Sequence, residues 1–164
     1  DWFAREVLPR VRNAAPAIEL HCIGGDVPAQ IRALGSLPGV HVHGHVPDLQ
    51  PWLARCRVSV APLRYGAGVK GKVNQAMAHG LPVVATSCAV EGMHLTDGHD
   101  VLMADDPQAF AEAVLRLHAD DALWRALSAN GRMNVERHFS PDAARAVVRD
   151  VFFAPRAGTP PVTC

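Results

Sequence analysis

Short apolar runs alternate with helix-patterned segments along almost the whole chain, and this alternation limits the possible folds most strongly. The runs that we interpret as strands are residues 18–23, 40–46, 58–63, 81–86 and 101–104. Between them, apolar residues recur at the three- and four-residue spacing of amphipathic helices. Strands of a parallel sheet are covered by helices on both faces, so most of their residues are apolar. The pattern predicts an α/β fold with a doubly wound, Rossmann-like parallel sheet.

The helical segments have recognisable starts and stops. We expect helices from the first residues of the chain, at residues 27–34 and 49–56, at a segment that buries Val69, Val73, Ala76 and Met77, after Asp106-Pro107, at residues 120–138 with a break near Gly131, and after Ser140-Pro141, where Ala144, Val147, Val148 and Val151 form an apolar stripe. Residues 87–98 are predicted to be a long polar loop. Residues 1–153 form one domain in this interpretation, and residues 154–164 are expected to be a disordered tail.

Charge and cysteine content exclude several classes of protein. The chain has 164 residues with 16 Lys and Arg against 16 Asp and Glu, so it has no net charge that would attract nucleic acid. No apolar run approaches the length needed to span a bilayer. Four cysteines without a C-x-x-C pair indicate neither a zinc site nor a disulfide framework. We expect a cytoplasmic protein.

Lys70 and Lys72 are the only two lysines in the chain, and both lie in a glycine-rich segment after the strand at 58–63. This segment contains the cations Arg64, Lys70 and Lys72 and the glycines Gly66, Gly68 and Gly71. Glycines let backbone N–H groups approach a ligand closely, and the start of a helix favours an anion. The segment therefore predicts a phosphate or diphosphate site. The alternative is a glycine-rich turn with solvated cations.

The spacing of Gly66, Gly68 and Gly71 matches the dinucleotide fingerprint G-x-G-x-x-G numerically. The segment follows the third expected strand, however, and that fingerprint belongs to the first strand of a βαβ unit. No acidic residue ends the following strand to bind a ribose. An NAD-dependent dehydrogenase domain is therefore disfavoured.

Residues 66–86 resemble the donor-binding signature of GT-B glycosyltransferases of the family 4, or group 1, type. Residues 43–46 with Asp48, residues 60–63, and residues 91–93 with 97–98 are similar to that family as well. The resemblance extends from about residue 2 to residue 153. It implies the carboxy-terminal, nucleotide-sugar-binding half of a GT-B architecture. It also implies that the amino-terminal, acceptor-binding domain and the strand that usually opens this half are absent from this chain.

The resemblance implies roles for individual residues. The residues that match the diphosphate-binding positions are Gly66, Gly68, Lys70 and Lys72, with Arg64 as a helper. Gln75 stands where the family usually has a glutamate that holds the ribose hydroxyls, and an amide can still donate and accept hydrogen bonds. A second family glutamate would fall at Tyr65 or Ala67 and is missing.

The remaining candidates lie on other loops. Glu91 is expected on the same rim as the glycine-rich segment and is a candidate contact for the donor sugar. The base-binding candidates are His45, Val46 and Asp48, because the family binds the base with the loop after this strand. The alternative for Val46 is a core position, and for Asp48 a helix N-cap. No catalytic residue is assigned.

His41, His43 and His45 alternate along one expected strand, which would place three imidazoles on one face. Such a row could suit a metal, but neither a carboxylate nor a thiol accompanies it in the sequence. We favour a polar strand face on which His45 reaches the rim of the cleft. The resemblance implies metal-independent chemistry, so no metal and no cofactor are expected.

These observations predict a glycosyltransferase domain that binds a nucleotide-diphosphate sugar and supports sugar transfer to an acceptor hydroxyl, with retention and without a metal. The expected partners are the donor, a glycan or lipid-linked glycan acceptor, and the missing amino-terminal domain of the same protein. The isolated chain is expected to be inactive. Bacterial cell-surface polysaccharide synthesis, at the inner face of the membrane, is the expected setting. The alternative is a non-catalytic nucleotide- or phospholigand-binding module of the same fold.

Overall fold

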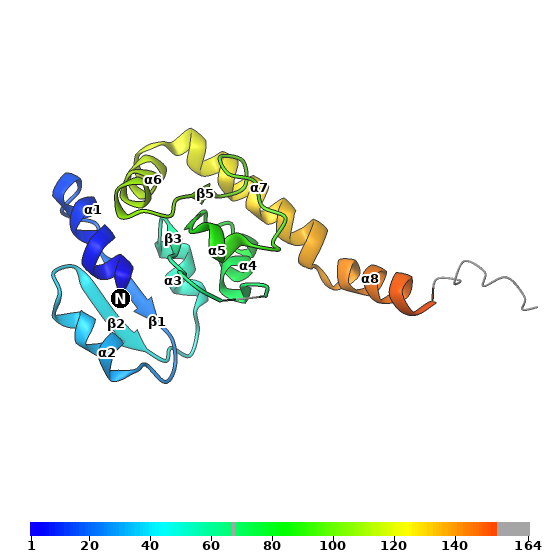
Figure 1. Ribbon diagram of the computed structural model, residues 1–164, viewed down its shortest axis with the longest axis horizontal. Helices are drawn as coiled ribbons and strands as arrows, with labels where there is room; N and C mark the ends of the chain where they lie inside the picture. Colours follow the sequence, from blue (N-terminus) through cyan, green and yellow to red (C-terminus); the bar gives the residue numbers. More distant parts are fainter. Residues whose placement is uncertain (67, 154–164) are drawn as a thin grey trace, which may run out of the picture.

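The computed structural model describes residues 1–66 and 68–153 and contains five strands in two parallel sheets (Figure 1). One sheet pairs β1 (Leu20–Ile23) with β2 (Val40–Gly44). The other has the order β3-β4-β5, with β3 (Ser59–Ala61), β4 (Val83–Ala85) and β5 (Leu102–Met103). The predicted α/β fold with parallel strands is confirmed. The strands hydrogen-bond in two groups, and the break falls between β1 and β3.

Helices connect successive strands, as the sequence pattern predicts, and further helices precede β1 and follow β5. They are the π-helical turn η1 (Phe3–Val7), α1 (Leu8–Ala14), α2 (Ala29–Arg32), the 3-10 turn η2 (Ala33–Ser36), α3 (Gln50–Arg55), α4 (Gly71–Ala78), α5 (Ser87–Val90), α6 (Pro107–Ala119), α7 (Asp121–Phe139) and α8 (Pro141–Phe153). Asp106 begins α6 as predicted, because its carboxylate accepts hydrogen bonds from the N–H groups of Gln108 and Ala109.

Two helical predictions differ from the structure. The segment at 87–98 is not a continuous loop, because α5 starts at Ser87, whose N–H and hydroxyl both donate to Asp105 Oδ1, at 2.8 and 3.0 Å. Helix α7 runs through Gly131 without a break. A side chain at Gly131 would place its Cβ 3.2 Å from Met77 Cγ, so the glycine permits close packing of α7 on α4. Gly131 therefore allows contact between two helices and does not interrupt α7.

Two predicted apolar faces are exposed in the structure. Val69 precedes the start of α4 and is 56% exposed, so it does not belong to the buried face of that helix. Helix α8 extends away from the body of the domain (Figure 1), and its stripe of Val147, Val148 and Val151 is exposed. The predicted tail at residues 154–164 lies outside the described residues.

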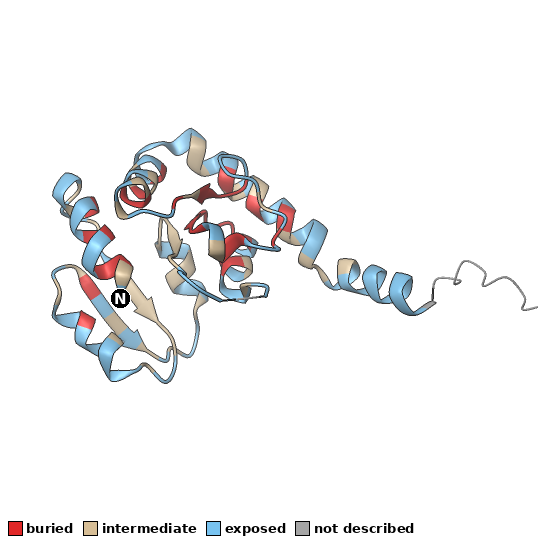
Figure 2. Ribbon diagram, viewed as in Figure 1, coloured by how far each residue is buried: buried red, intermediate tan, exposed pale blue. Residues whose placement is uncertain are grey.

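Two hydrophobic clusters form the core. The first packs η1, α1 and α6 together, and the ring of Phe110 makes edge-to-face contacts with Trp2 and Phe3 at centroid distances of 5.8 and 5.6 Å. The second packs α4 against β4 and includes Met77 and Met93. Figure 2 shows buried residues around β5, α4 and α6 and also in the first helices of the chain, whereas β1 is only partly buried. Strand β4, whose residues are all buried, is therefore better packed than β1.

Within the described part of the chain, no helix combines the length and the apolar character that a membrane crossing requires.

Candidate functional site

The glycine-rich segment after β3 forms an open loop that leads into α4. Gly66 and Gly68 have φ values of 135° and 79°, in the region that side chains disfavour. A Cβ atom added at either glycine would meet nothing within 4 Å, so space is open beside this backbone. The ammonium of Lys70 donates to the carbonyl oxygen of Gly68 at 2.6 Å. This lysine therefore closes over its own loop. Ala67 lies outside the described residues.

The loop is fastened to the neighbouring strand end. The hydroxyl of Thr86, which follows β4 and is buried, donates to the carbonyl oxygen of Leu63. In α5, the Cys88 thiol lies 3.7 Å from the carbonyl oxygen of Gly66. Both contacts come from the segment that follows β4, so the carboxyl ends of β3 and β4 support the loop together, as expected for neighbouring parallel strands.

Helix α4 starts without a capping side chain. The N–H groups of Val73 and Asn74 both donate to the carbonyl oxygen of Lys70, at 2.9 and 3.3 Å, so those of Gly71 and Lys72 precede the first helical bond. No acidic residue lies in the first turn. The partial positive charge of the helix start thus adds to that of Lys72.

The other long helices of the described chain begin differently. Asp106 caps α6 as described above, Asp120 accepts from the N–H of Leu123 in α7, and the Ser140 hydroxyl oxygen accepts from that of Ala143 in α8. Among the described helices of eight or more residues, α4 is thus the one whose start carries cations in place of a cap. An anion bound at the start of α4 would accept hydrogen bonds from its unpaired N–H groups.

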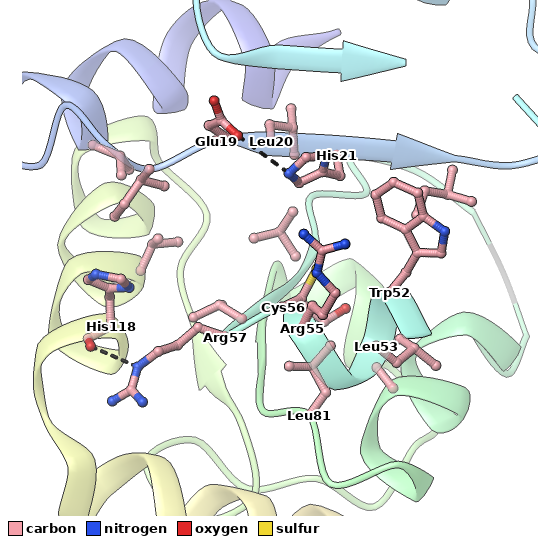
Figure 3. Close-up of a pocket in the computed structure, with 18 of the residues that line it drawn as sticks. Glu19, Leu20, His21, Trp52, Leu53, Arg55, Cys56, Arg57, Leu81 and His118 are labelled. Carbon is pink, nitrogen blue, oxygen red and sulfur yellow. Dashed lines mark hydrogen bonds and ion pairs between the residues drawn. The ribbon is translucent and has the colours of Figure 1, made fainter. Parts of the chain in front are cut away.

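Lys72 and Gln75 lie one helical turn apart on α4 and both line a cavity of about 630 Å³. The cavity separates the two sheets, with β1 on one side and β3 on the other. Figure 3 shows side chains of β1 and of α3 facing this hollow. The predicted diphosphate and ribose residues of α4 therefore share one side of the helix. Arg64 is exposed near the start of the loop.

The remaining predicted residues lie on separate loops. His45 and Asp48 are exposed and Val46 is half-buried in the loop after β2, while Glu91 is exposed directly after α5. Asp48 Oδ1 accepts a hydrogen bond from the N–H of Gln50 at 2.9 Å, which stabilises the start of α3. Within residues 1–66 and 68–153, no hydrogen bond or ion pair joins these four residues to the glycine loop. Their assignment to base and sugar binding stays a prediction.

The row of histidines differs from the expectation. Strand β2 ends at Gly44, which has a φ of 69°, so His45 lies beyond the strand and does not share a face with His41 and His43. His21 of β1 takes its place in the row. Its ring stacks on those of His41 and His43 at centroid distances of 5.0 and 5.2 Å, and His21 Nδ1 lies 3.0 Å from His43 Nε2.

A carboxylate also accompanies the histidines, contrary to the expectation from sequence. Glu19 Oε1 lies 3.3 Å from His41 Nε2, and Glu19 Oε2 lies 3.7 Å from His21 Nε2. Burial and then the neighbouring His41 and His43 lower the pKa of His21. Among the described residues, no group of histidine, cysteine and carboxylate side chains is arranged to hold a metal ion. The parallel register, which pairs His21 with His41, is the signal that sequence reasoning lacked.

Comparison with known proteins identifies the family to which the chain belongs. The family model described as glycosyl transferases group 1 matches residues 1–120. A probable sucrose-phosphate synthase of rice is 24% identical over 140 residues, which are 84% of this chain and 14% of that protein. The chain thus spans only a small part of this curated relative.

Solved structures share the fold. TarM from S. aureus, in a complex that includes UDP, superposes with a TM-score of 0.77 at 20% identity over 90% of this chain and 31% of that one. Sucrose-phosphate synthase from Thermosynechococcus elongatus gives 0.71 at 24% identity, over 92% and 42%. Anabaena HepE, solved with UDP, gives 0.73 at 15% identity, over 88% and 43%.

These structures are GT-B glycosyltransferases, and the parallel α/β arrangement of this chain corresponds to one of their Rossmann-like domains. The family model covers well over half of the chain, including β1 to β5 and the glycine loop. The chain belongs to the group 1 glycosyltransferases, as a domain of the carboxy-terminal type.

Proposed function

We propose that this chain binds a nucleoside diphosphate sugar and forms the donor-binding half of a glycosyltransferase. The observation that supports this most is the start of α4, where an open glycine loop, free N–H groups and Lys72 combine without a capping acid. A diphosphate brings the negative charge that this helix start lacks.

In this proposal, the loop backbone at Gly66 and Gly68 approaches the diphosphate, and the two lysines neutralise it with Arg64. Lys70 exchanges its bond to the Gly68 carbonyl for a phosphate oxygen. The bond between the anomeric carbon and the diphosphate breaks while the acceptor hydroxyl oxygen bonds to that carbon. Negative charge therefore grows on the leaving diphosphate, so cations fixed here stabilise the transition state more than the bound donor. The protein's cations supply this stabilisation without a metal ion, and the sugar is transferred with retention.

Gln75, one turn along α4 from Lys72, is placed by the proposal against the ribose hydroxyls. His45, Val46 and Asp48 contact the base, and Glu91 contacts the donor sugar. The acceptor, a glycan or a lipid-linked glycan, binds a separate amino-terminal domain of the same protein, so the isolated chain binds the donor without transferring sugar. UDP is the first nucleotide to test, because the TarM and HepE structures contain it.

The direct test is a calorimetric titration of UDP, GDP, TDP and ADP into the chain, with amide chemical shifts recorded for residues 66–75. We expect at least one nucleoside diphosphate to bind and to shift these amides. If none of the four perturbs them, the proposed donor site is wrong.

The double variant Lys70→Ala/Lys72→Ala tests the cations. A charge-assisted hydrogen bond contributes about 1.5–3 kcal/mol, so loss of both lysines is expected to weaken binding by roughly a hundredfold or more. Arg137→Ala is the matched control, because Arg137 is an exposed cation in the last turn of α7. Circular dichroism of both variants checks that the fold is retained. If the double variant and the control bind the nucleotide with equal affinity, the two lysines do not contribute to the binding site.

A non-catalytic nucleotide-binding module is the second candidate, because Gln75 replaces the usual glutamate. Sugar transfer by the full-length protein, measured with and without the change Gln75→Glu, distinguishes an enzyme from a non-catalytic module. If the protein is an enzyme, the unchanged form transfers sugar from the donor and the variant alters its rate. If the protein only binds, the unchanged form is inactive while still binding the nucleotide.

A further inference from the structure

Three imidazole rings and one indole ring form an aromatic cluster between the β1-β2 sheet and α3. His21 of β1 and His41 and His43 of β2 are the three stacked rings, and we call them the histidine stack. The indole of Trp52, in the first turn of α3, has its centroid 4.3 Å from that of His43 and 5.5 Å from that of His21. Figure 3 shows His21 and Trp52 next to each other beside the cavity. The histidine stack therefore supports the start of α3.

The rings of His21 and His43 share one hydrogen bond. His21 Nδ1 lies 3.0 Å from His43 Nε2, so one nitrogen donates a hydrogen and the other accepts it through its lone pair. When the pair takes up one proton from water, one N–H bond forms, and the resulting imidazolium still donates to the neutral ring. When both rings are protonated, neither nitrogen has a lone pair and the hydrogen bond is lost. This contact therefore requires that at least one of the two rings is neutral.

The charges around the histidine stack oppose the uptake of several protons. The Glu19 carboxylate, close to His21 and His41, offsets one positive charge. Further imidazolium rings would lie at centroid distances of only 5.0 to 6.3 Å from one another, and Arg55 of α3 adds a cation near His21. Burial, followed by the neighbouring His41 and His43, lowers the pKa of His21. Acidification therefore places like charges in a cluster whose geometry disfavours them.

Other charged or titratable side chains line the same cavity from different elements. Lys72 belongs to α4 and His118 to α6, and Arg57 lies at the start of the segment that leads into β3. Arg57 is engaged elsewhere, because it donates to the carbonyl oxygen of His118 and pairs with Asp121. The carboxylate of Glu19, the guanidinium of Arg55 and the rings themselves are thus the groups closest to the titration of the stack.

The helix that rests on the histidine stack is continuous with the proposed base-binding loop. Residues 45–49 connect β2 to α3, and Asp48 accepts a hydrogen bond from the N–H of Gln50 at the start of the helix. The N–H of Trp52 donates to the carbonyl oxygen of Leu49 at 3.1 Å. A displacement of Trp52 is therefore transmitted to this loop through a single helical turn.

We propose that the histidine stack is a proton-sensitive support for residues 45–49, and that its protonation weakens the binding of a nucleoside diphosphate. While the rings are largely neutral, they hold Trp52, and with it α3 and the loop, in the binding geometry. When more than one ring is charged, repulsion separates the rings and the indole loses its contact with His43. The proposal rests on the proposed function, because it concerns the regulation of that same site.

The first test measures nucleotide affinity at about pH 7.5 and about pH 5.5, with UDP, GDP, TDP and ADP as the probes. His21→Gln keeps a polar side chain that does not titrate, and His43→Gln is a second variant in case the first does not fold. Phosphate groups themselves titrate near about pH 6, so the variants are compared with the unchanged chain at each pH. We expect acidification to weaken binding about fivefold or more beyond the loss seen in the variants.

The matched control is His118→Gln, because His118 lines the same cavity without belonging to the histidine stack. It should keep the pH dependence of the unchanged chain. If His21→Gln weakens binding equally at both pH values, the stack has only a structural role, and the proposal is wrong. Acidification that tightens binding in the unchanged chain relative to the variants would mean that the charged stack attracts the diphosphate, which also contradicts the proposal.

The second test follows the histidine stack without nucleotide. Nuclear Overhauser contacts between the Trp52 indole and the His43 ring should be present at about pH 7.5 and lost at about pH 5.5, but retained at both in His21→Gln. Circular dichroism checks that the chain stays folded at the lower pH. Contacts that persist at the lower pH in the unchanged chain would overturn the proposal.

The two tests separate this inference from the proposed function. If none of the four nucleotides binds at either pH, the proposed function fails and the regulation fails with it. If a nucleotide binds with the same pH dependence in the unchanged chain, His21→Gln and His118→Gln, the proposed function stands and only the proton-sensitive support is overturned.

Discussion

Strands β4 and β1 both come from short segments that the sequence predicts to be strands, but they end in different surroundings. Val83, Val84 and Ala85 of β4 have no exposed surface, whereas every residue of β1 stays partly exposed. Strand β4 lies between β3 and β5, while β1 has β2 at one edge and the cavity at the other. Burial in this fold is therefore determined by the number of neighbouring strands as well as by the hydrophobicity of the residues.

The largest loss of stability is expected where the β1-β2 sheet and the β3-β4-β5 sheet share one hydrophobic core. Phe110 of α6 is fully buried and contacts η1, which leads towards β1, in a cluster that also includes Val84 of β4. Replacing Phe110 with Ala removes the ring from both sides and should lower the free energy of unfolding by about 3–5 kcal/mol. Urea unfolding followed by circular dichroism measures it. If the free energy of unfolding falls by less than about 1 kcal/mol, the two sheets do not share this core.

A matched pair of variants tests the contrast between β4 and β1 directly. Val84→Ala removes fully buried methyl groups and should cost about 2 kcal/mol of unfolding free energy. Leu20→Ala removes a larger side chain, but from a strand that is only partly buried, and should cost less than Val84→Ala. Equal costs for the two variants would contradict the contrast.

The smallest effect is expected from the stacked histidines of the β1-β2 sheet. Folding lowers the pKa of His21 below its usual value of 6.5, so around and below that pH the unfolded state binds more protons than the folded state. Stability should therefore fall as the pH falls through this range. His21→Gln should reduce the loss of unfolding free energy between about pH 7.5 and pH 5.5.

The matched control for the histidine experiment is His118→Gln, because the exposed side chain of His118 lies on α6, outside the stack. This control should keep the pH dependence of the unchanged chain. If His21→Gln and His118→Gln change the pH dependence equally, burial of His21 among its neighbours is not the cause.

Much of the fold could be predicted from local pattern. Helix starts at Asp106 and Ser140 and the strands around Val84 follow from capping residues and apolar spacing, which act over a few residues. The break at Gly131 was predicted wrongly, because the close packing of α7 on Met77 is a long-range contact. Val69 was assigned to a buried face because apolar spacing does not show that α4 starts only at Gly71.

The candidate site divides in the same way. The cations and glycines of residues 64–72 are adjacent in sequence, so their grouping at one loop could be recognised without a structure. The missing cap of α4 became informative only beside the capped starts of α6, α7 and α8. The roles of His45, Val46, Asp48 and Glu91 stay predictions, since they lie on loops whose side chains make no recorded bond to the glycine loop within the described residues.

The sequence by itself determined the alternation of strands and helices and the anion-attracting chemistry of the glycine loop, because both depend on residues a few positions apart. The tertiary structure decided which distant residues meet. Parallel pairing brings His21 and Glu19 beside His41, and it leaves β1 and β3 facing each other across an apolar cavity. Such contacts join residues about twenty or more positions apart, and no local period of apolar residues records the register or the neighbour of a strand.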